Sequence, residues 1–394
     1  MTRGRCLLKG LLICALAVPM PGAAHARNFR VLHVFKDTPD GATPWSELLF
    51  NGGKFYGTTL EGGTANDGTV YKMDAKGRVT LLYSFQGGND GRRPLANVIA
   101  DGAGNLYGVT DSGGSYDQGT AYRLAPDGTE TVIHTFTGGS DGGNSDAGLV
   151  LDNSGNLFGT TPVGGPYQAG VAFEISANGT FSVLHSFADG SDGGFPEDSL
   201  MLDNRGNLYG TAVTGGAYGF GAVYRISADG KFKVVYSFAG GTDGTYPQAR
   251  VIQDKAGNLY GTTDFGGGVG CSDSGGCGTI FKLAPDGTET VLHAFTGGSD
   301  GAAAYNGVVP DKEGNLYAAT KAGGNANGYG ALDKLAADGT FSVLHVFREL
   351  SDGEYPDRGV IDPRTGNFYG AAYTGGGDGW GTVFEFRNAV PEPP

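Results

Sequence analysis

The stretch Asn258-Leu259-Tyr260-Gly261-Thr262-Thr263 decides the fold, because it recurs with small changes along the whole chain. Its aromatic residue falls at seven positions, which are Tyr56, Tyr107, Phe158, Tyr209, Tyr260, Tyr317 and Tyr369. Successive positions are 51, 51, 51, 51, 57 and 52 residues apart. The chain therefore contains seven imperfect repeats of nearly equal length.

Glycine dominates the composition, with 74 glycines in 394 residues. Glycine at this frequency indicates many tight turns. Collagen would need a strict three-residue period and more proline, and a disordered chain would lack the recurrent Leu, Val, Tyr and Phe positions. The composition therefore predicts many short strands joined by turns.

Each repeat holds four short runs rich in β-branched, Leu or aromatic residues and bounded by Gly, Asp or Asn. In one repeat these runs are residues 147–151, 156–160, 170–175 and 181–187. The link between the first and second runs is Asp-x-x-Gly-Asn, and the link between the third and fourth is Asp-Gly or Asn-Gly. Both links are typical of tight hairpins. Each repeat is thus predicted to be a four-stranded antiparallel sheet.

The two ends of the chain complete one repeat between them. Residues 31–35 have the pattern of a fourth strand without its first three, and residues 381–384 that of a third strand without its fourth. A linear solenoid would leave open ends, whereas a ring closed in this way leaves none. The sequence therefore predicts an all-β fold, a seven-bladed β-propeller whose last blade is closed by the N-terminal strand.

The first 26 residues have the pattern of a signal peptide. Arg3, Arg5 and Lys9 precede the apolar run 11–18, and Ala24-His25-Ala26 fits the cleavage site. The apolar run is too short for a stable membrane span. We therefore expect an exported protein that is secreted, periplasmic or at the cell surface.

The expected mature chain is a propeller at residues 27–388, followed by a short Pro-rich tail at 389–394, without a transmembrane segment. Its 24 Lys and Arg face 41 Asp and Glu, a formal charge of −17. This excess argues against nucleic acid or an anionic membrane surface as partner, and is compatible with cations or neutral sugars. We expect a monomer that binds an extracellular glycan or protein.

Two cysteines remain after removal of the signal peptide. Cys271 and Cys277 lie in a Gly/Ser-rich insertion of the fifth repeat, with five residues between them. In an exported protein this spacing predicts a local disulfide, since no further His or Cys nearby completes a metal site. A loop this short contributes about 2 kcal/mol, so the bond fixes the insertion and does not hold the fold together.

Three runs resemble the bacterial GloVer (Gloeo/Verruco-type) choice-of-anchor tandem-repeat family over residues 31–386. They are the Asn-Leu-Tyr-Gly-Thr-Thr run, the Gly-Thr-Val-Phe-Lys-Leu run, and the Leu-His-x-Phe-x-Gly-Gly-x-Asp-Gly run at 292–301. The resemblance implies an exported protein and no established activity. The family carries differing C-terminal anchors, and residues 390–394, Val-Pro-Glu-Pro-Pro, are similar to the start of a PEP-type sorting signal.

Antiparallel alternation places the two tight links of every repeat on one face of the ring, and the two longer links on the other. We call these the hairpin face and the loop face, and expect recognition on the loop face. A Gly-x-Asp-Gly motif repeats there and places seven aspartates in equivalent positions: Asp40, Asp90, Asp141, Asp192, Asp243, Asp300 and Asp352. We expect no cofactor other than Ca²⁺, which such a ring could hold. Alternatively, each Asp accepts backbone hydrogen bonds in its own turn, which a sevenfold repeat favours.

Aromatic residues lie beside these acids on the loop face. The ligand-binding candidates come from the links between second and third strands: Tyr116, Tyr167, Tyr218, Phe265, Tyr329 and Trp380. Phe220 lies in the same links, and the other long links add Phe195, Tyr246, Tyr305 and Tyr355. Exposed aromatic faces flanked by carboxylates suit sugars, which predicts a glycan-binding surface. The alternative is that these rings pack between neighbouring loops.

Two further features invite a functional interpretation. Histidines occupy one fourth-strand position in five repeats, at His33, His134, His185, His293 and His345. Because each lies in a separate blade, we expect packing residues and not a shared site. In the sixth repeat Asp333 replaces an aromatic residue, and Arg250 and Arg358 are candidate partners for this carboxylate.

No catalytic constellation stands out. The chain lacks a haem-binding Cys-x-x-Cys-His motif, a phosphate loop and a Gly-x-Ser-x-Gly elbow. We therefore expect a binding or interaction module without assigned catalytic residues. The alternative is a polysaccharide-active lyase or hydrolase, whose acids and bases would come from scattered loops. Two loop carboxylates roughly 5–10 Å apart in one aromatic-lined cleft would favour that enzyme, because acid–base cleavage of sugars needs a pair of acids at this spacing.

Overall fold

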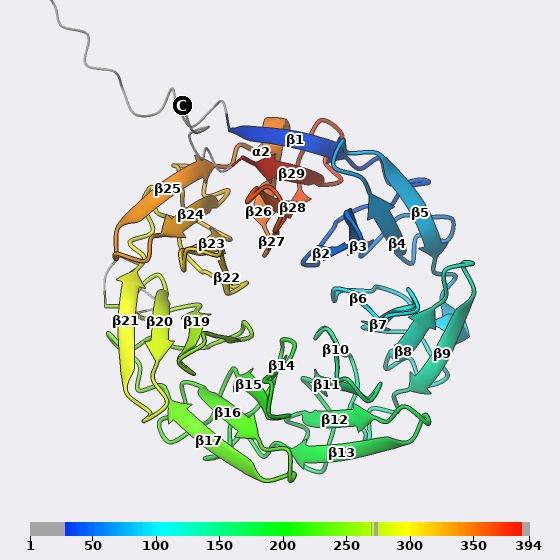
Figure 1. Cartoon of the computed structure of the whole chain (residues 1–394), viewed down its shortest axis with the longest axis horizontal. Helices are drawn as coiled ribbons and strands as arrows, with labels where there is room; N and C mark the ends of the chain where they lie inside the picture. The colour runs from blue at the N-terminus through cyan, green and yellow to red at the C-terminus, as the bar shows by residue number, and fades with distance from the viewer. Residues whose placement is uncertain (1–27, 269, 272–274, 388–394) are drawn as a thin grey trace, which may run out of the picture.

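Seven antiparallel β-sheets form a ring around a central axis in the computed structural model, which describes residues 28–268, 270–271 and 275–387 (Figure 1). Each sheet is one blade, with its first strand nearest the axis and its fourth strand on the outside. The prediction of a seven-bladed β-propeller is therefore confirmed.

Blades one to six each contain four consecutive strands, which follow one another from the axis outward. Blade one contains β2 (Leu49–Asn51), β3 (Lys54–Thr59), β4 (Thr69–Met73) and β5 (Val79–Ser84). Blade two contains β6 (Ile99–Ala100), β7 (Leu106–Thr110), β8 (Thr120–Leu124) and β9 (Glu130–Thr135). Blade three contains β10 (Val150–Leu151), β11 (Leu157–Thr161), β12 (Val171–Ile175) and β13 (Phe181–Ser186). Blade four contains β14 (Met201–Leu202), β15 (Leu208–Ala212), β16 (Ala222–Ile226) and β17 (Phe232–Ser237). Blade five contains β18 (Ile252–Gln253), β19 (Leu259–Thr263), β20 (Thr279–Leu283) and β21 (Glu289–Ala294). Blade six contains β22 (Val308–Pro310), β23 (Leu316–Thr320), β24 (Ala331–Leu335) and β25 (Phe341–Val346).

Blade seven is built from both ends of the chain. Its C-terminal strands are β26 (Glu354–Pro356), β27 (Val360–Ile361), β28 (Phe368–Thr374) and β29 (Thr382–Phe386), and its outer strand is β1 (Phe29–Val34). The β1–β29 pairing is antiparallel and runs from Phe29 opposite Phe386 to Val34 opposite Thr382. The predicted closure by the N-terminal strand is therefore confirmed. Two short helical turns, η1 (Gly88–Asp90) and α2 (Glu349–Asp352), lie in the links that follow fourth strands.

The core lies between neighbouring blades. A phenylalanine that follows each fourth strand is fully buried; these are Phe35, Phe85, Phe136, Phe187, Phe238, Phe295 and Phe347. At six of the seven interfaces this ring packs edge to face against an aromatic ring on the third strand of the next blade, as Phe187 does on Tyr224 at 5.0 Å between centroids. Third strands are buried along nearly their whole length, because neighbouring blades cover both of their faces.

The glycine of the recurring stretch makes room for that aromatic residue. In blade three Gly159 lies opposite Phe173, and a Cβ on Gly159 would meet Cζ of Phe173 at 2.6 Å. Any larger residue would displace the ring from the core. The recurrence of glycine and an aromatic residue in the sequence is thus one packing unit repeated around the ring.

The two faces differ as their links predict. On the hairpin face, Asp152 accepts hydrogen bonds from the backbone N–H groups of Ser154 and Asn156, each at 2.8 Å, and Gly155 takes a positive φ of 87°. On the loop face, single bridges such as Gly143 with Val163 join the two long links of one blade. The loop face is therefore a set of seven paired loops on a rigid scaffold.

A disulfide joins Cys271 to Cys277 in blade five, as the spacing predicted. The predicted signal peptide at 1–26 and the Pro-rich tail at 389–394 lie outside the described residues. Within the described part of the chain, no helix is long and apolar enough to cross a membrane.

Candidate functional site

The repeats differ from one another where the chain turns onto the first strand of each blade. The first residue in this segment is different in nearly every blade: Trp45, Leu95, Asp146, Glu197, Gln248, Tyr305 and Asp357. All seven line one cavity of about 60 Å³, which therefore lies on the axis of the ring at the loop-face ends of the first strands. The repetitive scaffold thus presents a varied set of side chains at this place. We call these seven residues and their ion-paired neighbours the axial site.

An ion-pair network crosses the axis beside this cavity. Glu47 of blade one accepts hydrogen bonds from Arg250 of blade five at 3.1 Å and from Arg358 of blade seven at 3.2 Å. Arg358 also donates to Asp198 of blade four at 3.2 Å. Burial and repulsion by Arg358 lower the pKa of Arg250. Four blades are therefore joined through charged side chains that come from the segments before the short inner strands.

Further carboxyl groups near the cavity have raised pKa values because the protein shields them from solvent. Burial raises the pKa of Asp357 to about 7, although its hydrogen bond from the Arg358 backbone and the Arg358 charge oppose the rise. Burial raises the pKa of Asp264 to about 6 against the attraction of Lys321. The pKa values of Asp146 and Glu197 are also raised, by burial first and then by nearby acids. Asp357 and Asp264 can therefore exchange protons near neutral pH.

Aromatic rings and one lysine complete the mouth of the site. The Lys321 ammonium lies 4.6 Å from the ring centroid of Trp45 and 4.7 Å from that of Tyr305. Trp45 also packs edge to face on Tyr373 at 4.4 Å. Tyr355 and Tyr373 line a smaller adjoining cavity with these residues. Among the described residues, Lys321 forms these ring contacts but no side-chain hydrogen bond or ion pair, so its N–H groups are available to a ligand.

Several buried polar atoms around the axis have no hydrogen-bond partner among the described residues. They are Oδ1 of Asp146, Oε1 of Gln248, Oδ1 of Asp264 and Nη1 of Arg358. Buried polar atoms are normally hydrogen-bonded, so this concentration at one place is unusual. The cavity has room for a few water molecules or for the end of a larger ligand.

The six aromatic candidates predicted from the sequence do not line the axial cavity. Tyr116, Tyr167, Tyr218 and Trp380 are exposed on separate loops, with exposed fractions of 61%, 65%, 63% and 39%. Phe265 and Tyr329 are half-buried. The structure therefore does not gather these six side chains into one pocket, and their role in binding stays a prediction.

Each of the seven predicted aspartates contacts a side chain of its own blade. The partner is the His or Tyr seven residues earlier on the outer strand, at 2.7 to 3.4 Å: His33, Tyr83, His134, His185, Tyr236, His293 and His345. These contacts favour the structural alternative for the aspartate ring. In the described ranges no group of three or more His, Cys, Asp or Glu is arranged to hold a metal ion. A calcium site stays an untested prediction.

One predicted pairing is wrong. Arg250 and Arg358 bond to Glu47 and Asp198, and neither oxygen of Asp333 has a hydrogen-bond partner among the described residues. Sequence reasoning also missed Glu47, Lys321 and Asp357 as members of a site. A signal that could have revealed much of the site was the variation, from blade to blade, of the segment before the first strand.

Fold and site together define a repeat β-propeller with an individual polar site on its axis. The family model described as the Gloeobacter/Verrucomicrobia repeat matches residues 23–205 and 271–391. The chain belongs to this repeat family, in agreement with its motifs. A search of curated proteins finds no match to the chain.

Solved structures with the same fold are distant in sequence. PorZ, a surface component of the type-IX secretion system of Porphyromonas gingivalis, superposes with a TM-score of 0.56 at 15% identity, over 91% of this chain and 48% of that chain. A puromycin-hydrolyzing peptidase of Mycobacterium tuberculosis gives 0.53 at 12% identity, over 90% and 53%. A protein of Bacteroides uniformis provisionally named a 6-phosphogluconolactonase gives 0.51 at 18% identity, over 77% and 84%. This chain spans about half the length of the first two. These likenesses show the propeller fold alone.

Proposed function

We propose that the chain is an exported binding module that receives the end of a neutral glycan at the axial site. The observation that carries this proposal is the lining of one cavity by residues of all seven blades, where Trp45 and Tyr305 lie beside buried carboxyl groups. Aromatic rings supply apolar faces for sugars, and carboxyl groups supply acceptors and donors for hydroxyls. Lys321 adds a donor at the mouth.

Catalysis is the second candidate function, and the shifted carboxyl groups favour it. Asp146, Glu197 and Asp357 line the same aromatic-walled cavity, and the pKa of Asp357 is raised to about 7 by burial. A group that titrates near the working pH is suited to general acid–base chemistry. A polysaccharide lyase or hydrolase on this scaffold would use these groups.

The test is binding of purified residues 27–394 to a panel of neutral and charged glycans, with released products assayed in the same samples. The chain contains two tryptophans, so Trp45→Ala and Trp380→Ala form a matched pair. We expect Trp45→Ala to weaken binding at least tenfold, about 1.4 kcal/mol, and Trp380→Ala to leave it unchanged.

Each other outcome overturns a part of the proposal. Loss of binding in Trp380→Ala alone would place recognition on the exposed loop aromatics. Release of shorter sugars that Asp357→Asn abolishes would make the protein an enzyme. Binding to no member of the panel would remove the glycan proposal and favour a protein partner.

A further inference from the structure

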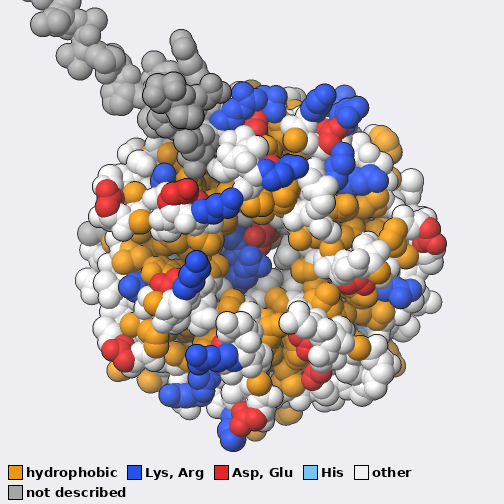
Figure 2. Space-filling view, in the orientation of Figure 1, with side chains coloured by type: hydrophobic (Ala, Val, Ile, Leu, Met, Phe, Trp, Pro, Cys, Tyr) orange, Lys and Arg blue, Asp and Glu red, His pale blue; other side chains and the backbone are white. Residues whose placement is uncertain are grey.

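A second hollow lies on the opposite face of the ring from the axial site's mouth. Its volume is about 1200 Å³, far larger than the axial cavity, and the hairpin links of blades four and five form part of its wall. Figure 2 shows the hollow at the centre of the ring, with hydrophobic side chains in its wall and Lys and Arg side chains around it. Near the axis the lining is apolar and comes from five first strands: Leu49, Ile99, Val150, Met201 and Ile252.

The hollow extends outward between blades four and five. Its lining continues from Met201 at the axis to Lys233 and Val235 on the outer strand of blade four, and to Pro285 after the third strand of blade five. The hollow therefore combines a central part at the axis with an extension between these two blades, and we call the two together the groove. A volume of this size is suited to a ligand of several linked rings, since pockets for drug-sized ligands measure about 300–1000 Å³.

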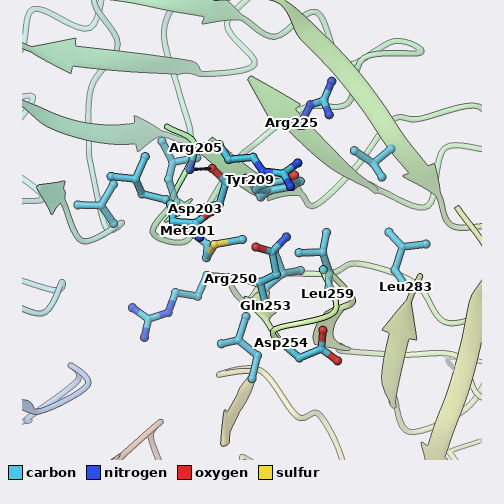
Figure 3. A pocket seen from close by; sticks show the side chains of 18 of the residues that line it. Met201, Asp203, Arg205, Tyr209, Arg225, Arg250, Gln253, Asp254, Leu259 and Leu283 are labelled. Atoms are coloured by element: carbon cyan, nitrogen blue, oxygen red, sulfur yellow. Dashed lines mark hydrogen bonds between the residues drawn. The ribbon is translucent and has the colours of Figure 1, made fainter. Parts of the chain in front are cut away.

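Five basic side chains line this groove. Arg250 is paired with Glu47, and the other four are Arg205, Arg225, Lys233 and Lys255. In the described part of the chain none of the four takes part in an ion pair. Nε of Arg225 is buried and has no hydrogen-bond partner there. Figure 3 shows Arg205 and Arg225 on the blade-four side of the groove, beside Tyr209.

The two acidic residues in the groove are held by their own hairpins. Asp203 accepts hydrogen bonds from the backbone N–H groups of Arg205 and Asn207, each at 2.8 Å, and Asp254 accepts equivalent bonds in blade five. Their oxygens therefore stabilise turns and do not neutralise the basic side chains one to one. The groove retains an excess of positive charge on a protein whose formal charge is −14.

Blade four differs from the other blades at the positions of Arg205, Arg225 and Lys233, which supply much of the positive charge. The residues equivalent to Arg225 are Lys72, Arg123, Glu174, Lys282, Lys334 and Glu385, and those equivalent to Lys233 are Thr80, Thr131, Ser182, Thr290, Ser342 and Arg30. At the hairpin position of Arg205 the next three blades have Ala256, Glu313 and Arg364. Only blade four is basic at all three positions, so this concentration is not a property of the repeat.

We propose that this groove binds an acidic oligosaccharide through basic side chains that are not part of the axial site. Arg205 and Arg225 present planar guanidinium groups, which bond to carboxylates through two parallel hydrogen bonds. Lys233 and Lys255 extend the positive charge along and across the groove, which suits a chain with repeated acidic groups. Met201 and Ile252 supply apolar surface for the sugar faces between those groups.

The experiment measures binding of a galacturonate tetramer to residues 27–394 by titration calorimetry at low salt. A neutral galactose tetramer of equal length is the ligand control. We expect the double variant Arg205→Gln/Arg225→Gln to weaken galacturonate binding at least tenfold. Arg123→Gln is the matched protein control, because Arg123 has the same strand position in blade two and its Nε is also buried without a partner among the described residues. It should change binding less than twofold.

Three outcomes would overturn the proposal. One is equal weakening by Arg123→Gln, which would indicate unspecific attraction to basic side chains. Another is equally tight binding of tartrate, which would indicate a site for small anions. The third is wild-type affinity in the double variant. Trp45→Ala should leave galacturonate binding unchanged, so a failure of the axial-site proposal is distinguishable from a failure of this one.

Discussion

Asp333 of β24 lies directly opposite Ala318 of β23 in blade six, where each of the other six blades places an aromatic residue opposite glycine. Asp333 is fully buried, and neither of its oxygens has a hydrogen-bond partner in the described part of the chain. Burial raises its pKa well above the ordinary value, so the neutral acid is the form the fold favours. Phe295 of blade five is accordingly the one inter-blade phenylalanine without an aromatic ring at this position of the next blade.

Restoring the common pair should stabilise the ring. We expect Ala318→Gly/Asp333→Phe to unfold at higher urea concentration, with a gain of about 2 kcal/mol, because a buried phenylalanine side chain contributes roughly 1.5–3 kcal/mol. The new ring would also meet Phe295, as Phe281 meets Phe238 at 5.2 Å.

The single variants are the controls for this cycle. Asp333→Phe alone should destabilise, because the Cβ of Ala318 would lie where the equivalent contact in blade three measures only 2.6 Å. Ala318→Gly alone should cost about 1 kcal/mol through backbone freedom. If the single effects sum to the double effect, the two positions do not form one packing unit.

The axial carboxyl groups should make Trp45 a reporter of pH. In a Trp380→Phe background Trp45 is the remaining tryptophan, because the chain contains two. Its emission should change between about pH 5 and 8, because Asp264 and Asp357 titrate near 6 and 7. Asp357→Asn should remove the upper part of the transition. An emission that does not change with pH would contradict the assignment of these groups to the surroundings of Trp45.

The same shift has a defined effect on stability. The pKa of Asp357 is higher in the folded chain than in the unfolded chain, so the folded state favours its protonated form. Stability from this group is therefore present at low pH and is lost as the pH rises from about 4 to 7, by about 1.4 kcal/mol per unit. The melting temperature of Asp357→Asn should rise relative to wild type over this window. A constant difference would contradict the shift.

The repeats made the fold predictable from sequence, whereas the site required the structure. Strand order, hairpins and ring closure follow from features repeated in nearly every blade, such as Gly159 and its partner Phe173. Glu47 and Arg250 are 203 residues apart, and no local pattern relates them. Their contact depends on the ring bringing blades one and five to a common axis. The exposed loop aromatics were predicted from their loops alone, and loop position does not say which side chains converge.

The aspartate ring should stabilise blades without calcium. Asp192 accepts from Nε2 of His185 at 3.1 Å and from the backbone N–H of Ala188 at 3.1 Å. Losing such bonds should make Asp192→Asn less stable by about 1–2 kcal/mol. Adding calcium or a chelator should leave the melting temperature of wild type unchanged. A rise in that temperature with calcium, absent in Asp192→Asn, would instead support the metal site.

The ion-pair network across the axis should stabilise the folded state more than any surface ion pair does. Glu47→Gln removes the negative charge between Arg250 and Arg358. The side chain of Arg358 is only 5% exposed, and Asp198 is then its remaining charged hydrogen-bond partner among the described residues. Removing one partner of a buried ion pair costs about 3–5 kcal/mol, whereas an exposed pair contributes about 0–1 kcal/mol. Asp117→Asn, which removes the exposed pair with Arg92, is therefore the matched control. Urea denaturation followed by Trp45 emission should show a clearly lower midpoint for Glu47→Gln and little change for Asp117→Asn. Equal midpoints in the two variants would mean that water screens the axial charges as fully as it screens surface charges. The ion-pair network would then not stabilise the axial site.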